Sequence, residues 1–123
     1  MKPETDADVV LLRHMLECLD HIDADTGCDR SVFFGSRMVR DAVLRKLQLL
    51  TESSQRLSAT IKATEPGIPW RQLSGTRNIL VHAYLGGIDE QAVWETIARD
   101  LPPLREAVLR MLARASASPS ASP

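Results

Sequence analysis

The sequence predicts an all-α protein folded as an up-down bundle of four to five helices. Apolar residues recur every three to four positions along most of the chain, which is the spacing of an amphipathic helix. No stretch alternates apolar and polar residues as a half-buried strand would. Of the 123 residues, 44% are hydrophobic and 25% are charged, which is ordinary for a globular protein and excludes wholesale disorder. We therefore expect one helical domain over residues 1–115 and a disordered Ser/Ala/Pro tail over residues 116–123.

The first helix is predicted over residues 6–23. Thr26-Gly27 follows it and is a typical stop signal. Its apolar stripe at helical spacing consists of Val9, Leu12, Leu16 and Leu19, extended by Met15 and Ile22.

The long second helix, predicted over residues 36–63, gives the strongest periodic signal in the chain. Ser36 is a plausible N-cap, because its hydroxyl can accept a hydrogen bond from the first turn. At 1.5 Å per residue the helix would be about 40 Å long and would form the backbone of the fold. Its apolar seam advances by steps of three or four residues through Val39, Val43, Leu47, Leu50, Ser54, Leu57 and Ile61.

Three shorter helices are predicted in the rest of the chain. The stretch Glu65-Pro66-Gly67-Ile68-Pro69 breaks the long helix, and Pro69 suits the first turn of a third helix over residues 70–82. Asp89 caps a fourth helix of about ten residues, and Leu101-Pro102-Pro103 turns the chain into a fifth over residues 103–114. The inward residues expected here are Val93, Trp94, Ile97, Leu104, Val108, Leu109, Met111 and Leu112. Trp70 and Trp94 are expected to anchor the core.

The net charge of −1 conceals a split along the chain. Residues 1–29 carry two basic and eight acidic side chains, whereas residues 30–62 carry seven basic and two acidic ones. A neutral total argues against nonspecific polyanion binding by the whole surface. It leaves open a local basic face, oppositely charged regions that meet across an oligomer, and ordinary solvated helix faces.

The cysteine count and the N-terminus predict a cytoplasmic, reduced protein. Cys18 and Cys28 are too few for a disulfide scaffold. No apolar run approaches the ~18 residues of a membrane span, so no membrane contact is expected. The first residues are acidic, and Arg13 and His14 interrupt the apolar stretch that a signal peptide would need.

Chemistry is concentrated in residues 77–84. Phosphate-binding glycine loops, His-Glu-x-x-His, Cys-x-x-Cys and Gly-x-Ser-x-Gly are all missing from the sequence. Asn78 and His82 lie four residues apart on one helix face, and the long Arg77 side chain can reach toward them. Arg suits phosphate oxygens and His can move a proton at neutral pH, which together suit phosphodiester cleavage without a metal or other cofactor. On these residues alone, a structural histidine is the commoner outcome.

Several runs of the sequence resemble one family. They are Arg40-Asp41-Ala42-Val43 through Leu57-Ser58, Ile68-Pro69-Trp70-Arg71-Gln72-Leu73-Ser74-Gly75-Thr76-Arg77-Asn78, His82-Ala83-Tyr84 and Val93-Trp94-Glu95-Thr96. Together they resemble the HepT family of HEPN-domain toxins over about residues 8–112. The Arg-x4-His pattern alone is common by chance, but the Arg-x4-His-x-Tyr element at the right distances from Pro-Trp-Arg and Trp-Glu-Thr is specific.

The resemblance implies a homodimeric, metal-independent endoribonuclease that cleaves tRNA or mRNA. It implies that Arg77 and His82 are the catalytic pair, that Asn78 orients them, and that both subunits contribute such a pair to one cleft. It also implies a partner, an MntA-like minimal nucleotidyltransferase antitoxin of a type VII toxin–antitoxin system, which transfers AMP from ATP to Tyr84. Here Ala83 stands where the family often has an acidic residue. That departure puts in doubt the basicity of the histidine and recognition by the antitoxin.

Two further groups of polar residues carry weaker predictions. Arg45, Gln48 and Glu52 form a polar stripe on the long helix, and Arg45 and Glu52 could line the cleft or make ordinary salt bridges. Similar proteins often have Gly-Glu-Ala where this chain has Thr51-Glu52-Ser53. His14, Cys18 and His21 share a face of the first helix and could bind zinc or nickel, but no fourth ligand is evident. A role at an interface or core edge is therefore favoured for them.

Two other functions remain open from the sequence. A catalytically silent HEPN dimer could hold RNA or a partner enzyme, because an Arg-His pair can persist after activity is lost. A plain helical dimerisation adaptor would need His82 only as a structural residue.

Overall fold

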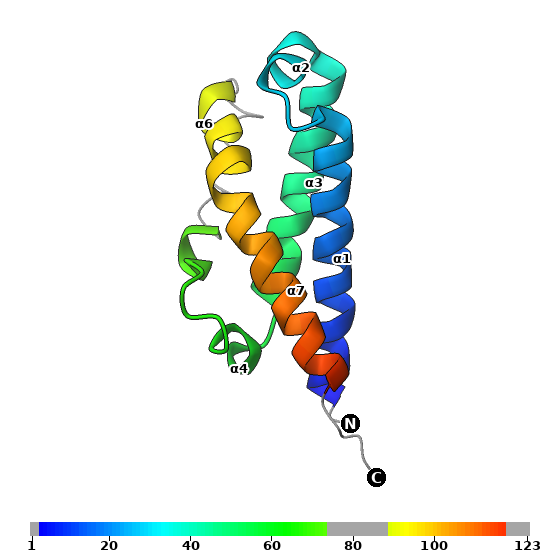
Figure 1. Ribbon diagram of the computed structural model, residues 1–123, viewed down its shortest axis with the longest axis vertical. Coiled ribbons are helices and arrows are strands. Elements are labelled where there is room, and N and C mark those ends of the chain that lie inside the picture. Colours follow the sequence, from blue (N-terminus) through cyan, green and yellow to red (C-terminus); the bar gives the residue numbers. More distant parts are fainter. Residues whose placement is uncertain (1–2, 74–88, 118–123) are drawn as a thin grey trace.

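The computed structural model describes residues 3–73 and 89–117, and this part of the chain is all-α without a strand. In Figure 1, α1 (Pro3–Thr26) and α3 (Arg37–Arg56) run antiparallel along the long axis of the molecule, and α7 (Leu101–Ala117) crosses them. The short helices α2 (Arg30–Gly35), α4 (Ala59–Lys62) and α6 (Glu90–Glu95) lie toward the ends of this frame. The predicted fold class is confirmed for the described residues.

The first helix is three residues longer at each end than the predicted range of 6–23, and it ends at the predicted stop signal Thr26-Gly27. Gly27 and Cys28 both adopt positive φ, +60° and +57°, which takes the chain out of the helix. The fully buried Thr26 hydroxyl donates to the Ile22 carbonyl at 2.9 Å and accepts the Cys28 N–H at 3.1 Å. The Thr26 side chain therefore links the last turn of α1 to the segment that follows it. Helix α2 directly after it was not predicted; Asp29 caps it by accepting the Ser31 N–H at 2.9 Å.

The predicted single helix over residues 36–63 is wrong at its end. Ser36 caps α3 as expected, accepting the Val39 N–H at 3.2 Å. Leu57, however, is extended, with ψ of 145°, and α3 stops at Arg56. Ser58 begins the separate helix α4, and the buried Asp8 carboxylate of α1 accepts both the Ser58 N–H at 2.9 Å and its hydroxyl at 2.6 Å. A partner 50 residues away thus stabilises a break that the apolar spacing does not reveal.

The predicted turn at Leu101-Pro102-Pro103 is also wrong. Helix α6, a π-helical turn η1 (Thr96–Asp100) and α7 follow one another without interruption. The Leu101 N–H donates to the Thr96 carbonyl, five residues back. Pro102 and Pro103 have no N–H to continue the regular α-helical bonding, so the wider turn accommodates them without ending the helix. Residues 70–73 are helical, while the rest of the third predicted helix lies outside the described residues, as do residues 118–123 of the predicted tail.

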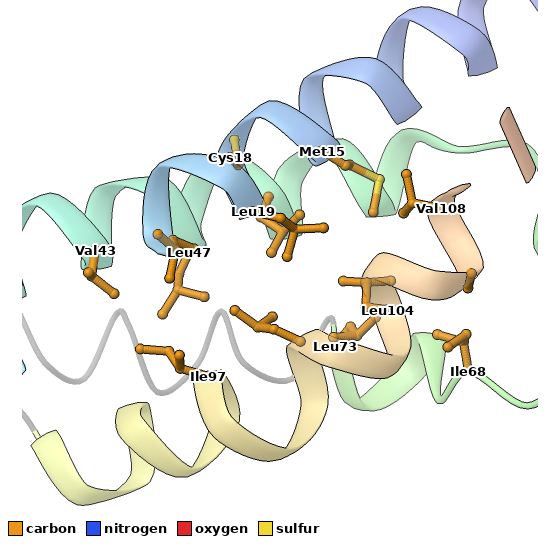
Figure 2. Close-up of a cluster of buried hydrophobic side chains, with 14 of the residues drawn as sticks. Met15, Cys18, Leu19, Val43, Leu47, Ile68, Leu73, Ile97, Leu104 and Val108 are labelled. Atoms are coloured by element: carbon orange, nitrogen blue, oxygen red, sulfur yellow. The ribbon is translucent and has the colours of Figure 1, made fainter. Parts of the chain in front are cut away.

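The core fills the space between α1, α3 and α7 (Figure 2). The predicted stripes point inward at most positions, and Trp70 and Trp94 pack half-buried against the core. Leu109 is an exception, because it is 43% exposed. Among the described residues, no helix combines the length and the hydrophobicity that a membrane span requires. The fully buried large side chains include Leu12, Met15, Ile22, Phe33, Val43, Leu47, Leu50, Leu104, Val108 and Met111.

Candidate functional site

Four of the predicted site residues, Arg77, Asn78, His82 and Tyr84, lie outside the described residues. The structure describes the chain on both sides of them, up to Leu73 and again from Asp89. It also describes Arg45 and Glu52. The described part of the candidate site consists of the chain on either side of these residues and the surface around Glu52.

The chain leading to the predicted site is held by a carboxylate between two arginines. Glu65 has a side chain only 10% exposed, although it lies in a loop. Its oxygens accept from Arg110 Nη2 at 2.7 Å and from Arg114 Nη2 at 2.6 Å, both on α7. Arg110 Nε adds longer bonds of 3.2 and 3.3 Å. These hydrogen bonds lower the pKa of Glu65 from 4.5 to about 2, so it is ionised at neutral pH.

Apolar contacts fix the same loop. Ile68 and Leu73 are buried and belong to the same cluster as Leu104 of α7, as Figure 2 shows. The Trp70 indole N–H donates to the carbonyls of Lys62 and Glu65, both at 3.2 Å. The loop therefore reaches Leu73 in a defined position, four residues before Arg77.

The chain leaving the predicted site is anchored at the other end of the bundle. Asp89 caps α6 as predicted, accepting the Ala92 N–H at 3.1 Å. Arg40 on α3 forms an ion pair with Glu90 at 3.1 Å and also donates to the Phe34 carbonyl at 2.6 Å. Arg30 donates to Gln91 at 2.9 Å and lies over the Phe34 ring, 4.5 Å from its centroid. Both flanks are thus tied to helices far away in the sequence.

Arg45 and Glu52 share a face of α3 but do not line the same hollow. Arg45 is exposed and donates to Gln48 at 3.3 Å. Glu52 lines a groove of about 340 Å³ between α1 and α3. The other lining residues are Val10, Leu11, His14, Leu49, Ser53 and Arg56.

This groove is not predictable from the sequence pattern. Glu52, Ser53 and Arg56 are neighbours on one helix, but only the antiparallel pairing of α1 with α3 brings His14 and Val10 beside them. Neither Glu52 nor Arg56 has an ion-pair partner in the parts of the chain that the structure describes.

The three residues considered for a metal site lie on α1 at its contact with α3. Cys18 is 1% exposed, and its Sγ lies 3.8 Å from His14 Nε2. Burial raises the pKa of the Cys18 thiol, which favours the neutral form over the thiolate that metals bind. The buried Nδ1 of His21 has no hydrogen-bond partner, and no three candidate ligands come together within residues 3–73 and 89–117. This arrangement places Cys18 in the core and His14 at its edge.

The chain is similar to a family of ribonucleases and to several of its members. The model of the family described as "Ribonuclease HepT-like" matches residues 15–111. "Putative RNase MJ1380" of Methanocaldococcus jannaschii is 33% identical over 89 residues, which are 72% of this chain and 81% of that protein. "Probable ribonuclease HepT" of Thermococcus cleftensis is 35% identical over 78 residues, 63% of this chain and 64% of that protein.

A bacterial relative shows similar coverage. "Putative RNase TTE0752" of Caldanaerobacter subterraneus subsp. tengcongensis is 28% identical over 102 residues, 82% of this chain and 90% of that protein. No solved structure matches the chain. Because the family match spans most of the helical domain, including both anchored flanks, the chain belongs to the HepT-like ribonuclease family.

Proposed function

We propose that this protein is a metal-independent endoribonuclease that cleaves tRNA or mRNA in the cytoplasm, as the toxin of a type VII toxin–antitoxin pair. The observation that carries the proposal is the family match over residues 15–111, which encloses the Arg77-x4-His82 element. In the proposed homodimer, one such element from each subunit lines a common cleft. The anchored flanks support this, because a catalytic pair needs a scaffold that holds it within a narrow range of geometry.

The proposed reaction is a transesterification within the RNA strand. One His82 accepts the proton of a ribose 2′-OH, whose oxygen then attacks the adjacent phosphorus. The bond from phosphorus to the 5′-oxygen breaks, and that oxygen takes a proton from the other His82. Arg77 binds the non-bridging oxygens and stabilises their developing charge, while Asn78 orients the pair. The products are a 2′,3′-cyclic phosphate and a 5′-hydroxyl, with no net change in protons.

The proposed control is covalent. An MntA-like nucleotidyltransferase antitoxin transfers AMP from ATP to the Tyr84 hydroxyl, releasing pyrophosphate. The added phosphate and nucleoside would occupy space near Arg77 and repel the RNA backbone, so the modified toxin would be inactive. Each transfer adds about 329 Da to the intact mass. Tyr84→Phe co-expressed with the antitoxin should lack this increment.

Cleavage of bulk tRNA in EDTA tests the proposal. The wild type and His82→Ala are compared, and the cleaved ends are assayed for 2′,3′-cyclic phosphate. We expect cleavage by the wild type and none by the variant, with both proteins equally folded by circular dichroism. Cleavage that persists in His82→Ala contradicts the assignment of His82. If neither protein cleaves and the wild type carries no AMP, the protein is a silent binding module.

A further inference from the structure

The groove between α1 and α3 contains polar groups that have no protein partner in the part of the chain that the structure describes. Ser53 is only 6% exposed, yet its hydroxyl has no hydrogen-bond partner among the described residues. Because Ser53 lines the groove, this hydroxyl is free to donate to a ligand that enters it.

The two charged groups of the groove, Glu52 and Arg56, are also without an ion-pair partner within residues 3–73 and 89–117. Glu52 and Arg56 lie one turn apart on α3, in the order that favours an ion pair within a helix. Even so, they form no salt bridge with each other or with another described residue. Elsewhere on α3 the comparable pair Arg37–Asp41 does form, at 3.8 Å. Both groups therefore remain available to a ligand in the groove.

The rest of the lining is apolar. Val10 is 66% exposed, and Leu11 and Leu49 are half-buried beside it. The volume of about 340 Å³ falls in the range of small-molecule sites and suits one nucleotide unit. An apolar patch that borders a cation, a carboxylate and a hydroxyl suits a ligand with a flat apolar part, an anion and hydroxyl groups.

We propose that the α1–α3 groove binds one nucleotide of a single-stranded RNA, as a holding site separate from the residues that cut it. Arg56 binds a phosphate, and the Ser53 hydroxyl donates to the same phosphate or to the sugar. The Glu52 carboxylate accepts from the ribose 2′-OH, a donor that DNA lacks. Val10, Leu11 and Leu49 contact the base.

The charge of α3 favours RNA over other occupants. Arg45 is exposed and lies on the same face of α3 as Arg56, three turns earlier and about 16 Å away along the helix axis. Arg45 extends the positive side of the groove along α3, as a backbone-tracking RNA site requires.

The inference rests on the proposed ribonuclease function, and binding to an inactive chain tests it independently. The chain carrying His82→Ala is titrated into a fluorescent single-stranded RNA of about 12 nucleotides, and into DNA of the same sequence, at several salt concentrations. Arg56→Ala, Ser53→Ala and Glu52→Ala are each added to this background. The matched control is Arg99→Ala, which removes an exposed arginine from η1 without touching the groove.

We expect Arg56→Ala to weaken RNA binding about tenfold and Ser53→Ala less, while Arg99→Ala has little effect. The slope of log affinity against log salt should fall by about 0.7 in Arg56→Ala, as for one lost phosphate contact to a single strand. Glu52→Ala should reduce the preference for RNA over DNA.

Equal effects of Arg56→Ala and Arg99→Ala would overturn the inference, as would the absence of any RNA binding. If Arg56→Ala instead changes the molecular mass in sedimentation, the groove is an interface between copies and the inference is wrong. Failure of wild-type protein without AMP to cleave RNA would refute the proposed function, but it would leave the comparison of affinities intact.

Discussion

Neutralising Glu65 should destabilise the protein in a manner that depends on pH. The carboxylate is ionised in the folded state and accepts hydrogen bonds from Arg110 and Arg114, which hold its pKa at about 2 instead of 4.5. At about 1.4 kcal/mol per pKa unit, the difference corresponds to at most about 3.5 kcal/mol. The two arginine side chains are 53% and 47% exposed, so solvent screening reduces the expected value to about 1–2 kcal/mol.

The sign of the pH dependence follows from the lowered pKa. The stabilisation is fully present above the unfolded pKa of about 4.5 and is lost as the pH falls toward the folded pKa of about 2. Glu65→Gln should therefore be less stable than the wild type at pH 6, by an amount that shrinks between pH 5 and pH 3.

Urea unfolding followed by circular dichroism measures this difference. Glu17→Gln, at an exposed position on α1, is the matched control and should match the wild type at each pH. A loss in Glu65→Gln that stays constant from pH 6 to pH 3 would refute the reasoning, because it would show that the ion pairs are not the source of the stabilisation.

Three other predictions test the frame of the fold. Asp8→Ala should lower the free energy of unfolding by about 1–3 kcal/mol in urea, because the part-buried Ser58 N–H and hydroxyl lose their acceptor. Ellman's reagent should titrate Cys28 rapidly in the native protein and Cys18 only after unfolding, since the first is exposed and the second is 1% exposed. Arg40→Met should lower the melting temperature by about 4–8 °C per kcal/mol lost, because it breaks the link from α3 to α6 and frees two carbonyls of α2. Equal stability of the Asp8 or Arg40 variant and the wild type, or rapid labelling of both thiols, would contradict the respective prediction.

Features set by neighbouring residues were predictable from the sequence. The stop after Thr26 follows from Gly27, and the caps at Ser36 and Asp89 follow from short polar side chains placed before apolar periodic runs. The spacing of the inward residues in α1 and α3 is a local property of a helix. Most of the core residues on these two helices could therefore be predicted.

Features that depend on residues far away in the sequence were not predictable. The break after Leu57 depends on Asp8 from another helix, and apolar spacing carries no information about it. The turn expected at Pro102 does not form, because the π-helical turn before it lets the helix continue although the two prolines lack an N–H. Leu109 was expected inside because helical spacing alone does not say how wide the covered face of α7 is.

The same distinction holds for the candidate site. The Arg77-x4-His82 element is a local pattern, and it was found together with its family context. The link from Glu65 to Arg110 spans 45 residues, and the groove joins Glu52 to His14 across two helices. Neither could be found without knowing which helices are neighbours.

The π-helical turn η1 has a consequence for the chain lengths that this fold tolerates. A π-turn holds one residue more than the regular α-helix that it interrupts. Deleting Ala98 from η1 would close that turn to a regular one, and the Pro102 ring would then clash with the carbonyl four residues before it, so the extra residue of η1 is what lets the helix continue through the two prolines. Deleting the fully buried Ala107 would rotate the rest of α7 by about 100°, moving Arg110 and Arg114 away from Glu65. The number of residues is therefore fixed in both parts of this long helix, by the prolines in the first and by the buried face in the second.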